Sequence, residues 1–224
     1  MSNKWFVIGT LSIGLIACVY FFTRPNETTD TIKQPNSSQE MGSKATESAV
    51  VFVRPHSPRF GNAMGRVTVV EWLDPECEAC RAMHIHVKKF ITEYGDRVSF
   101  VIRYMPYHKG SMYAASVLEE TREFGAFEKA LDILMAKQPE WGSHHSPRPD
   151  LIPTYLTGLG IPPENFNRET VIAKHKEKIL IDQKDGIAAG VKGTPSFFIN
   201  EKPLLKLGVE QLREAIETAL ADKI

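Results

Sequence analysis

The feature that most constrains the fold is a short apolar segment that leads directly into a helical pattern. Residues 67–73 (Val-Thr-Val-Val-Glu-Trp-Leu) are rich in β-formers and apolar on both faces, which is typical of a central strand covered on both sides. Asp74-Pro75 breaks this strand, apolar residues then recur at helical spacing as far as Gly95, and residues 97–105 indicate a second strand. A strand, a helix and a strand in this order predict a parallel pair joined by a right-handed crossover.

Helix and strand signals continue along the rest of the chain. The pattern predicts helices around residues 114–121, 127–134, 151–159, 168–188 and 209–220, and a hairpin of strands at 196–200 and 203–207. The fold class that this order predicts is α/β, a sheet with helices packed on it and an all-helical excursion between its two halves.

The N-terminus carries a membrane signal. Residues 5–23 contain no charged side chain, and as a helix they would span about 28 Å, close to the hydrocarbon thickness of a bilayer. An uncleaved anchor is favoured, because the apolar run continues without an Ala-x-Ala-like cleavage site. Leu15-Ile16-Ala17-Cys18 also resembles a bacterial lipobox, which would lipidate Cys18, and a cleaved signal peptide is the third alternative. All three deliver the rest of the chain outside the cytoplasm.

The composition of the chain is that of an ordinary globular protein. Apolar residues make up 42% and charged residues 24% of the chain. The 27 basic side chains equal the 27 acidic ones, so no net positive field favours nucleic acid. Residues 24–48 are polar and show no apolar period, which predicts a flexible tether, and residues 49–224 are long enough for one domain.

Cys77-Glu78-Ala79-Cys80 lies where the first strand ends and the helix begins. A helix N-terminus offers unpaired N–H groups and the positive end of a dipole, which stabilise a thiolate at Cys77. Cys80 lies one helical turn further on, so we expect Cys77 to be the exposed nucleophile and Cys80 its buried partner. A zinc site is disfavoured because no second pair exists, and haem attachment because Arg81 follows the second cysteine. A purely structural disulfide remains an alternative, although closing so short a loop gains little entropy.

These residues resemble a known family. The run from Val69 to Cys80 is similar to the active-site segment of DsbA-like thiol-disulfide oxidoreductases, in the thioredoxin superfamily, and Gly193-Thr194-Pro195-Ser196 is similar to their cis-proline loop. The long separation between Cys80 and Pro195 requires an insertion. The resemblance implies a thioredoxin-like fold, residues 49–105 and 168–224, with a helical insertion at 106–167.

The resemblance also implies a role for each matching residue. Cys77 matches the nucleophile, Cys80 the resolving thiol, and Thr194-Pro195 a loop that binds a substrate strand through a cis proline. A trans proline at the start of an edge strand is the alternative. Glu71 matches a buried acid beneath the site, where burial should raise its pKa and allow it to relay a proton for Cys80. Its alternative is an acid paired with a nearby lysine.

Four residues are candidates for tuning the site. Glu76, Glu78 and Ala79 flank the nucleophile, and His84 lies four positions after Cys80. The two acids should oppose thiolate formation, and Glu78-Ala79 replaces the Pro-His of the most oxidising family members. We therefore expect Cys77 to be less acidic, and the disulfide less oxidising, than in those members.

The sequence therefore predicts an extracytoplasmic protein thiol-disulfide oxidoreductase in the bacterial cell envelope. It implies a Cys77–Cys80 redox pair as the active group, no other cofactor and no resident metal. Expected partners are cysteine-containing substrate proteins, a membrane redox partner that resets the pair and the membrane itself, with no nucleic acid and a monomeric state. Alternatives are a reductase, an isomerase (disfavoured because only the short tether precedes the domain), and a copper chaperone in which Met83 and His84 join the cysteines.

Overall fold

The computed structural model describes residues 50–143 and 145–222. The predicted anchor at residues 5–23, Cys18 and the tether at 24–48 lie outside the described residues. Contacts divide the chain into Met1–Thr46 and Glu47–Ile224, and all described residues belong to the second unit. Among them, no helix combines the length and the apolar character that crossing a bilayer requires.

A five-stranded sheet has the order β1-β3-β2-β4-β5. The strands are β1 (Arg59–Gly61), β2 (Val67–Leu73), β3 (Val98–Tyr104), β4 (Ser196–Ile199) and β5 (Lys202–Pro203). β2 and β3 are parallel, as the sequence predicted, whereas β1, β4 and β5 each pair antiparallel with a neighbour. The hairpin strand expected at 203–207 is wrong in its extent: it ends at Pro203, which has no N–H to donate to a ladder.

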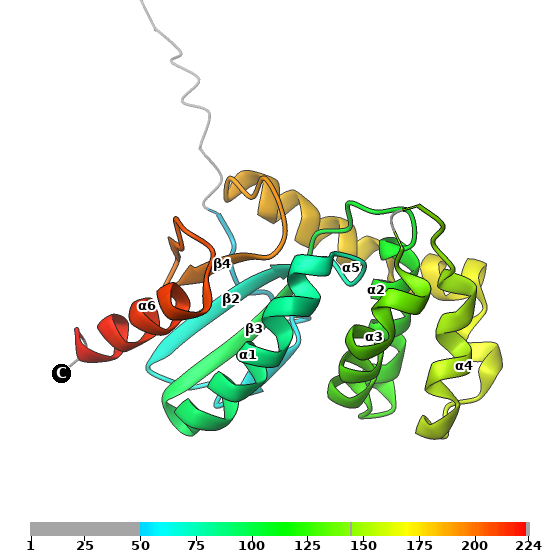
Figure 1. The fold of residues 1–224 in the computed structure, drawn as a ribbon, viewed down its shortest axis with the longest axis horizontal. Coiled ribbons are helices and arrows are strands. Elements are labelled where there is room, and N and C mark those ends of the chain that lie inside the picture. Colours follow the sequence, from blue (N-terminus) through cyan, green and yellow to red (C-terminus); the bar gives the residue numbers. More distant parts are fainter. Residues whose placement is uncertain (1–49, 144, 223–224) are drawn as a thin grey trace, which may run out of the picture. The chain divides into compact units, whose positions relative to one another are not determined.

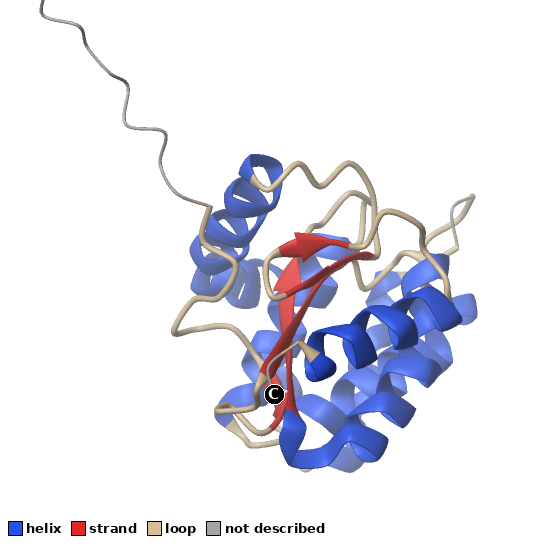
Figure 2. Cartoon of the chain, turned by 90° about the vertical axis from the view of Figure 1, so that its left-hand side faces the viewer, coloured by secondary structure: helices blue, strands red, loops and turns tan. Residues whose placement is uncertain are grey.

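Helices cover both faces of this sheet (Figure 2). They are α1 (Glu78–Tyr94), α2 (Ser111–Glu123), α3 (Phe127–Trp141), α4 (Ile152–Leu156), α5 (Arg168–Ala188) and α6 (Val209–Ala221), with short 3-10 turns η1 (Gly95–Arg97), η2 (Pro149–Leu151), η3 (Thr157–Leu159) and η4 (Pro163–Phe166). The elements α2 to η4 lie between β3 and α5 along the chain, beside the sheet in Figure 1, and form the predicted helical insertion.

The alternation of side chains along β2 divides the core around the sheet. Val67 and Val69 pack with α1 and α6, while Val70 and Trp72 face the opposite side, where Phe198 and Val191 complete a second apolar cluster. A third cluster fills the helical insertion and includes Leu73 together with both cysteines of the predicted site. The end of β2 therefore lies at the junction between the sheet and the insertion.

A buried ionic network ties α5 to the sheet. The Arg103 side chain on β3 is fully buried and donates to Asp182 at 2.7 Å and to Asp185 at 2.5 Å, both on α5. α5 approaches closely at Gly186, where a Cβ atom would lie 2.5 Å from the Trp72 indole nitrogen. Because α5 leads directly into the predicted proline loop, this network helps to fix where that loop lies.

We expect Arg103→Ala to lower the free energy of unfolding by about 3–5 kcal/mol, because it removes the fully buried cation that binds two carboxylates and leaves them Arg54 and His56, which are nearer the surface. Denaturant unfolding would measure the loss. Arg148→Ala is the matched control, since it removes an exposed ion pair with Asp150 and should leave stability unchanged. Equal effects of the two substitutions would contradict a structural role for the buried network.

Candidate active site

Cys77 is the residue from which α1 starts. Its backbone is extended (φ −75°, ψ 123°), and its carbonyl accepts the first helical hydrogen bond from Arg81 N–H at 3.1 Å. The chain turns into the helix at Asp74, whose carbonyl accepts from Cys77 N–H at 3.0 Å. The sequence placed the dithiol at this junction, and the strand–turn–helix geometry puts the sulfur against the free amides of the first turn.

The exposed fractions of the two cysteines differ less than the sequence predicts. Cys80 is fully buried, as predicted, but only 9% of Cys77 is exposed, so the expected exposed nucleophile retains a narrow window to solvent. Cys77 packs in the apolar cluster of the insertion, and the Gln138 side chain on α3 donates to the carbonyls of Pro75 and Cys77, both at 2.9 Å, which holds α3 against the turn. Both thiols are free.

The pKa values of the two thiols move in opposite directions. A hydrogen bond from the Cys80 thiol lowers the pKa of Cys77 to about 5, with further help from Thr194 and from the amides of Cys80 and Ala79, against the opposing effect of burial. Burial raises the pKa of Cys80 well above its ordinary value, and its bond to Cys77 adds to the rise. At neutral pH the pair therefore holds one thiolate, on the sulfur that retains access to solvent.

The cis-proline loop faces this thiolate. The Thr194–Pro195 peptide bond is cis, which confirms the prediction and excludes the trans alternative. The Thr194 carbonyl oxygen lies 3.1 Å from the Cys77 sulfur. Cys77 and Thr194 are 117 residues apart in the chain. The pairing of Trp72 on β2 with Ser196 on β4 brings them together.

Glu71 is buried in the middle of β2, on the same face as Val69 and Leu73. Only 4% of the residue is exposed, and its Oε1 has no hydrogen-bond partner among the described residues. Burial raises the pKa of this carboxyl to about 8, and the negative charge of Cys77 adds to the rise. No lysine is recorded as a partner of Glu71 in the described structure, so the geometry does not support the alternative of a paired acid.

The two acids next to the dithiol differ in their surroundings. Glu76 is buried, and its carboxylate accepts from Gly110 N–H at 2.6 Å, so its charge holds the loop after β3. Glu78 is exposed in the first turn of α1. Neither is among the leading causes of the low Cys77 pKa, whereas Ala79 acts through its backbone amide. Whether the two acids tune the redox pair remains a prediction.

His84, which the sequence offers as a residue that tunes the site, is buried on α1. Only 9% of the residue is exposed, and its Nε2 lies 2.8 Å from an oxygen of Asp132 on α3. Burial lowers the pKa of the imidazole, and the bond to Asp132 opposes that shift. Packing of α1 against α3 buries the histidine, and this contact between residues 48 apart leaves no local signal in the sequence.

Sequence reasoning missed a polar cluster under the turn. Asp74 is fully buried and accepts from the backbone amides of Glu76 and Tyr107, at 2.9 and 2.7 Å, and from the Ser111 hydroxyl. The His108 Nδ1 lies 2.7 Å from the same carboxylate, which raises the pKa of the imidazole against the effect of burial. This cluster fixes the loop after β3 over the start of α1, and the only sequence signal for it is Asp74-Pro75 itself.

The described residues offer no metal site at the dithiol. Met83 is buried in the core between the sheet and α1, apart from the cysteines' own cluster. Among residues 50–143 and 145–222, the group of three ligand-type side chains that comes together is Glu120, Glu123 and His175, and Lys174 binds both of those carboxylates at 2.7 and 2.6 Å.

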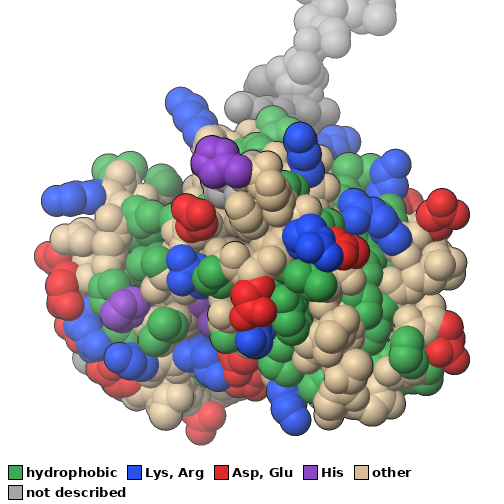
Figure 3. Space-filling view, turned by 45° about the vertical axis from the view of Figure 1, so that its right-hand side comes forward, with side chains coloured by type: hydrophobic (Ala, Val, Ile, Leu, Met, Phe, Trp, Pro, Cys, Tyr) green, Lys and Arg blue, Asp and Glu red, His purple; other side chains and the backbone are tan. Residues whose placement is uncertain are grey.

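Acidic and basic side chains are interspersed over the face of the molecule shown in Figure 3.

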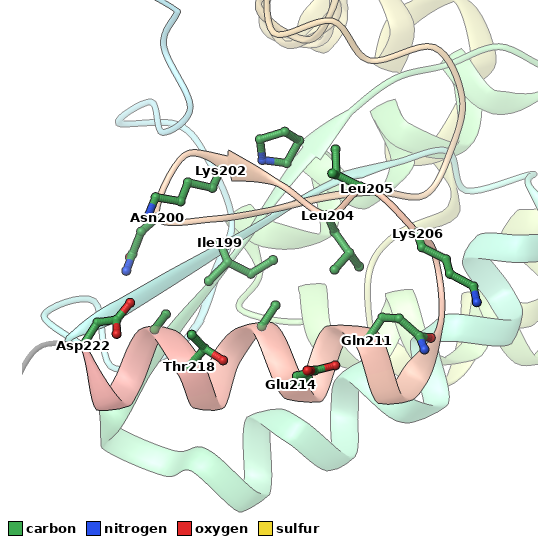
Figure 4. A pocket seen from close by; sticks show the side chains of 13 residues that line it. Ile199, Asn200, Lys202, Leu204, Leu205, Lys206, Gln211, Glu214, Thr218 and Asp222 are labelled. Atoms are coloured by element: carbon green, nitrogen blue, oxygen red, sulfur yellow. The ribbon is translucent and has the colours of Figure 1, made fainter.

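A groove of about 630 Å³ lies between α6 and the segment that contains β5 (Figure 4). Leu204 and Leu205 contribute apolar surface, and Lys202, Glu214 and Asp222 contribute charge. None of the predicted site residues lines this groove.

Comparison with known proteins agrees with this geometry. A family model described as thioredoxin matches residues 54–218. Among solved structures, a thioredoxin-like oxidoreductase from Silicibacter pomeroyi DSS-3 superposes with a TM-score of 0.64 at 25% identity, over 77% of this chain and 96% of that one. A periplasmic thioredoxin-like protein from Salmonella enterica serovar Typhimurium gives 0.64 at 24% identity, over 78% and 96%.

Two kinds of relative match among curated proteins. A putative protein-disulfide oxidoreductase of Rickettsia felis is 25% identical over 206 residues, which cover 88% of this chain and 73% of that protein. A Na(+)/H(+) antiporter NhaA of Herminiimonas arsenicoxydans is 27% identical over 172 residues, which cover 75% of this chain. The chain spans only 27% of the length of that antiporter.

Removal of the Cys80 thiol should raise the pKa of Cys77. The variant Cys80→Ala loses the strongest stabilising contact of the thiolate, so the pKa should rise from about 5 towards its ordinary value. Ultraviolet absorbance of the thiolate during a pH titration would measure it, with Cys77→Ala as the blank. An unchanged pKa in Cys80→Ala would contradict the assigned cause.

Glu71→Gln should stabilise the reduced protein at neutral pH. A carboxyl with a pKa of 4.5 when unfolded and about 8 when folded costs stability that appears as the pH rises above 4.5. Its removal should therefore raise the free energy of unfolding by about 3 kcal/mol at pH 7 and have no effect below the unfolded pKa. Denaturant unfolding at pH 4 and pH 7 tests the sign, and equal stabilities at pH 7 would contradict the raised pKa.

Proposed function

The chain belongs to the thioredoxin family, and on that premise we propose that it is a DsbA-like protein thiol-disulfide oxidoreductase that exchanges disulfides through Cys77 and Cys80. The family match confirms the resemblance drawn from the sequence. The observation that carries the proposal is the environment of Cys77: a thiol with a pKa of about 5 at a helix N-terminus, whose sulfur lies 3.1 Å from the carbonyl of Thr194 and donates to it when protonated. The nucleophile Cys77, the resolving thiol of Cys80 and the backbone of Thr194, which would pair with a substrate segment, therefore lie together.

Exchange would run through a mixed disulfide. A substrate thiolate attacks the Cys77 sulfur of the Cys77–Cys80 disulfide, that bond breaks, and Cys80 leaves and takes up a proton. A second substrate thiolate then attacks the substrate sulfur and expels Cys77 as a thiolate. Two electrons pass from the substrate, which gains a disulfide, to the cysteine pair, which becomes a thiol and a thiolate.

Residues around the two cysteines would support the exchange. The backbone of Thr194, turned by the cis Pro195, would offer β-type hydrogen bonds to an extended substrate segment. Glu71 would supply the proton to the Cys80 sulfur as it leaves, because burial keeps the carboxyl protonated at neutral pH. The low pKa of Cys77 stabilises the reduced pair and therefore favours the oxidising direction over the reducing one.

The setting of the activity is part of the proposal. We infer an extracytoplasmic location from the uncharged residues 5–23, which would anchor the chain, and from the periplasmic protein among its structural neighbours. A membrane redox partner would reoxidise the pair there, and the substrates would be exported proteins with cysteines. The transport activity of the antiporter relative concerns a much longer protein and is not proposed for this chain.

The copper chaperone receives no support from the geometry. It required Met83 and His84 to turn towards the two cysteines, but Met83 is buried against the sheet and His84 binds Asp132. A soft-metal site would therefore have two sulfur ligands and no third ligand from these residues.

The variant Cys80→Ala should trap substrate on Cys77. Incubation with a synthetic peptide that carries an internal disulfide should give a stable mixed disulfide, since the resolving thiol of Cys80 is absent. Intact-mass analysis should show one peptide per chain, removable with dithiothreitol. Cys77→Ala is the matched control and should bind none.

Two outcomes would count against the proposed function. An absence of adduct on Cys80→Ala, with the protein folded, would show that Cys77 does not react with disulfides. Stoichiometric Cu(I) binding by the wild type without any adduct on Cys80→Ala would favour the chaperone instead.

A further inference from the structure

A small cavity next to Glu71 points to a route for protons. It has a volume of about 20 Å³ and lies between the sheet and the helices α1 and α3. Its walls are mostly apolar, and its polar lining consists of Glu71 from β2, His84 and Lys88 from α1, and Glu128 and Asp132 from α3. The buried acid of the site therefore shares one cavity with polar side chains on two helices.

Such a route would let Glu71 exchange protons with solvent within a single exchange reaction. The carboxyl is 4% exposed, and its Oε1 has no partner among residues 50–143 and 145–222, so burial restricts its exchange with bulk water. After Glu71 gives its proton to Cys80, the charged carboxylate is unfavourable in this apolar setting until it regains a proton. A route to solvent would return this carboxylate to its neutral form while the cysteine pair is still reduced.

The cavity can hold a water molecule that makes this connection. One water needs roughly 10–15 Å³ and at least two polar partners. The cavity exceeds that volume, and Glu71 and His84 both line it, one from the sheet side and one from the helix side. A water there would accept from, or donate to, both side chains.

His84 continues the route to the surface. Its Nε2 lies 2.8 Å from Asp132, which also binds Lys88, and the side chains of Asp132 and Lys88 are 31% and 41% exposed. The charged groups that act on the imidazole are Asp132 and Glu128 from α3 and Lys88 from α1, and burial lowers its pKa despite the two acids. A neutral imidazole can accept a proton on one nitrogen and release one from the other.

We propose that His84, held by Asp132, passes protons between solvent and Glu71 by way of a water in this cavity. The inference rests on the proposed function and extends it to the fate of the proton. In substrate oxidation, Cys80 leaves as a thiolate and takes the proton of Glu71. His84 then takes a proton from solvent beside Asp132 and, as an imidazolium, gives one to the cavity water while that water gives one to the Glu71 carboxylate. The net uptake is one proton from solvent, and in the reducing direction each transfer is reversed.

The role assigned to His84 is that of a positioning and relay residue, since it acts through Glu71 and touches neither substrate nor sulfur. His84→Gln keeps a hydrogen bond to Asp132 but cannot exchange a proton, and His84→Ala leaves room for free imidazole. Asp132→Asn weakens the outer end of the route. His86→Gln is the matched control, because His86 lies on the same helix and does not line the cavity.

The test uses the reduced protein at pH 7, mixed with a disulfide peptide. Acid quenching and mass analysis separate attack by Cys77 from release of the peptide by Cys80. In His84→Gln and Asp132→Asn we expect an unchanged first step and at least about tenfold slower release, with a larger solvent isotope effect. In His84→Ala, added imidazole should restore the release rate. His86→Gln should match the wild type in both steps.

The outcomes separate this inference from the proposed function. Release at the wild-type rate in folded His84→Gln, or slow release in His84→Ala that imidazole does not restore, would overturn the relay while leaving exchange through Cys77 intact. Equal slowing in His86→Gln would also overturn it, because the effect would then be structural. Failure of the wild-type protein to form any mixed disulfide would contradict the proposed function itself.

Discussion

The antiparallel pairing of β4 with β2 is the constraint on which the rest of the site depends. The register that places Ser196 opposite Trp72 brings Thr194 and Pro195 to the point where β2 turns into α1. Without that pairing, Cys77 would have a helix N-terminus but no backbone edge for a partner strand. α5 delivers the chain to this position, and its ionic link through Arg103 joins this helix to the sheet.

Burial and hydrogen bonds determine which of the three ionisable groups of the site, Cys77, Cys80 and Glu71, carries a charge. Cys77 keeps a negative charge because Cys80 and two backbone amides donate to it, while burial keeps Cys80 and Glu71 protonated. The groups are coupled, since charge on Cys77 raises the pKa of Glu71. An arrangement in which one sulfur is charged and its neighbours hold protons is suited to sulfur exchange with proton transfer.

The sequence predicted those parts of the molecule whose signals are local. β2 and α5 have the predicted bounds, because apolar residues recur at strand or helix spacing over their whole length. β1 was missed because three residues carry no period. Other features arise from contacts with the insertion. These contacts bury His84 and Cys77, and they include the hydrogen bonds that Asp74 and Glu76 accept from the loop after β3. Such contacts depend on how helices pack, which the chain's own periodicity does not specify.

The reduction potential of the cysteine pair tests the central claim most directly. Equilibration in glutathione buffers, acid quenching and mass analysis would count the chains that carry a Cys77–Cys80 disulfide. A charged Cys77 without the Pro-His pair predicts a reversible two-electron transition between about −270 mV, typical of thioredoxin, and about −120 mV, typical of the strongest oxidants. A disulfide that fails to form at any buffer ratio, or one more stable than that of thioredoxin, would contradict the account.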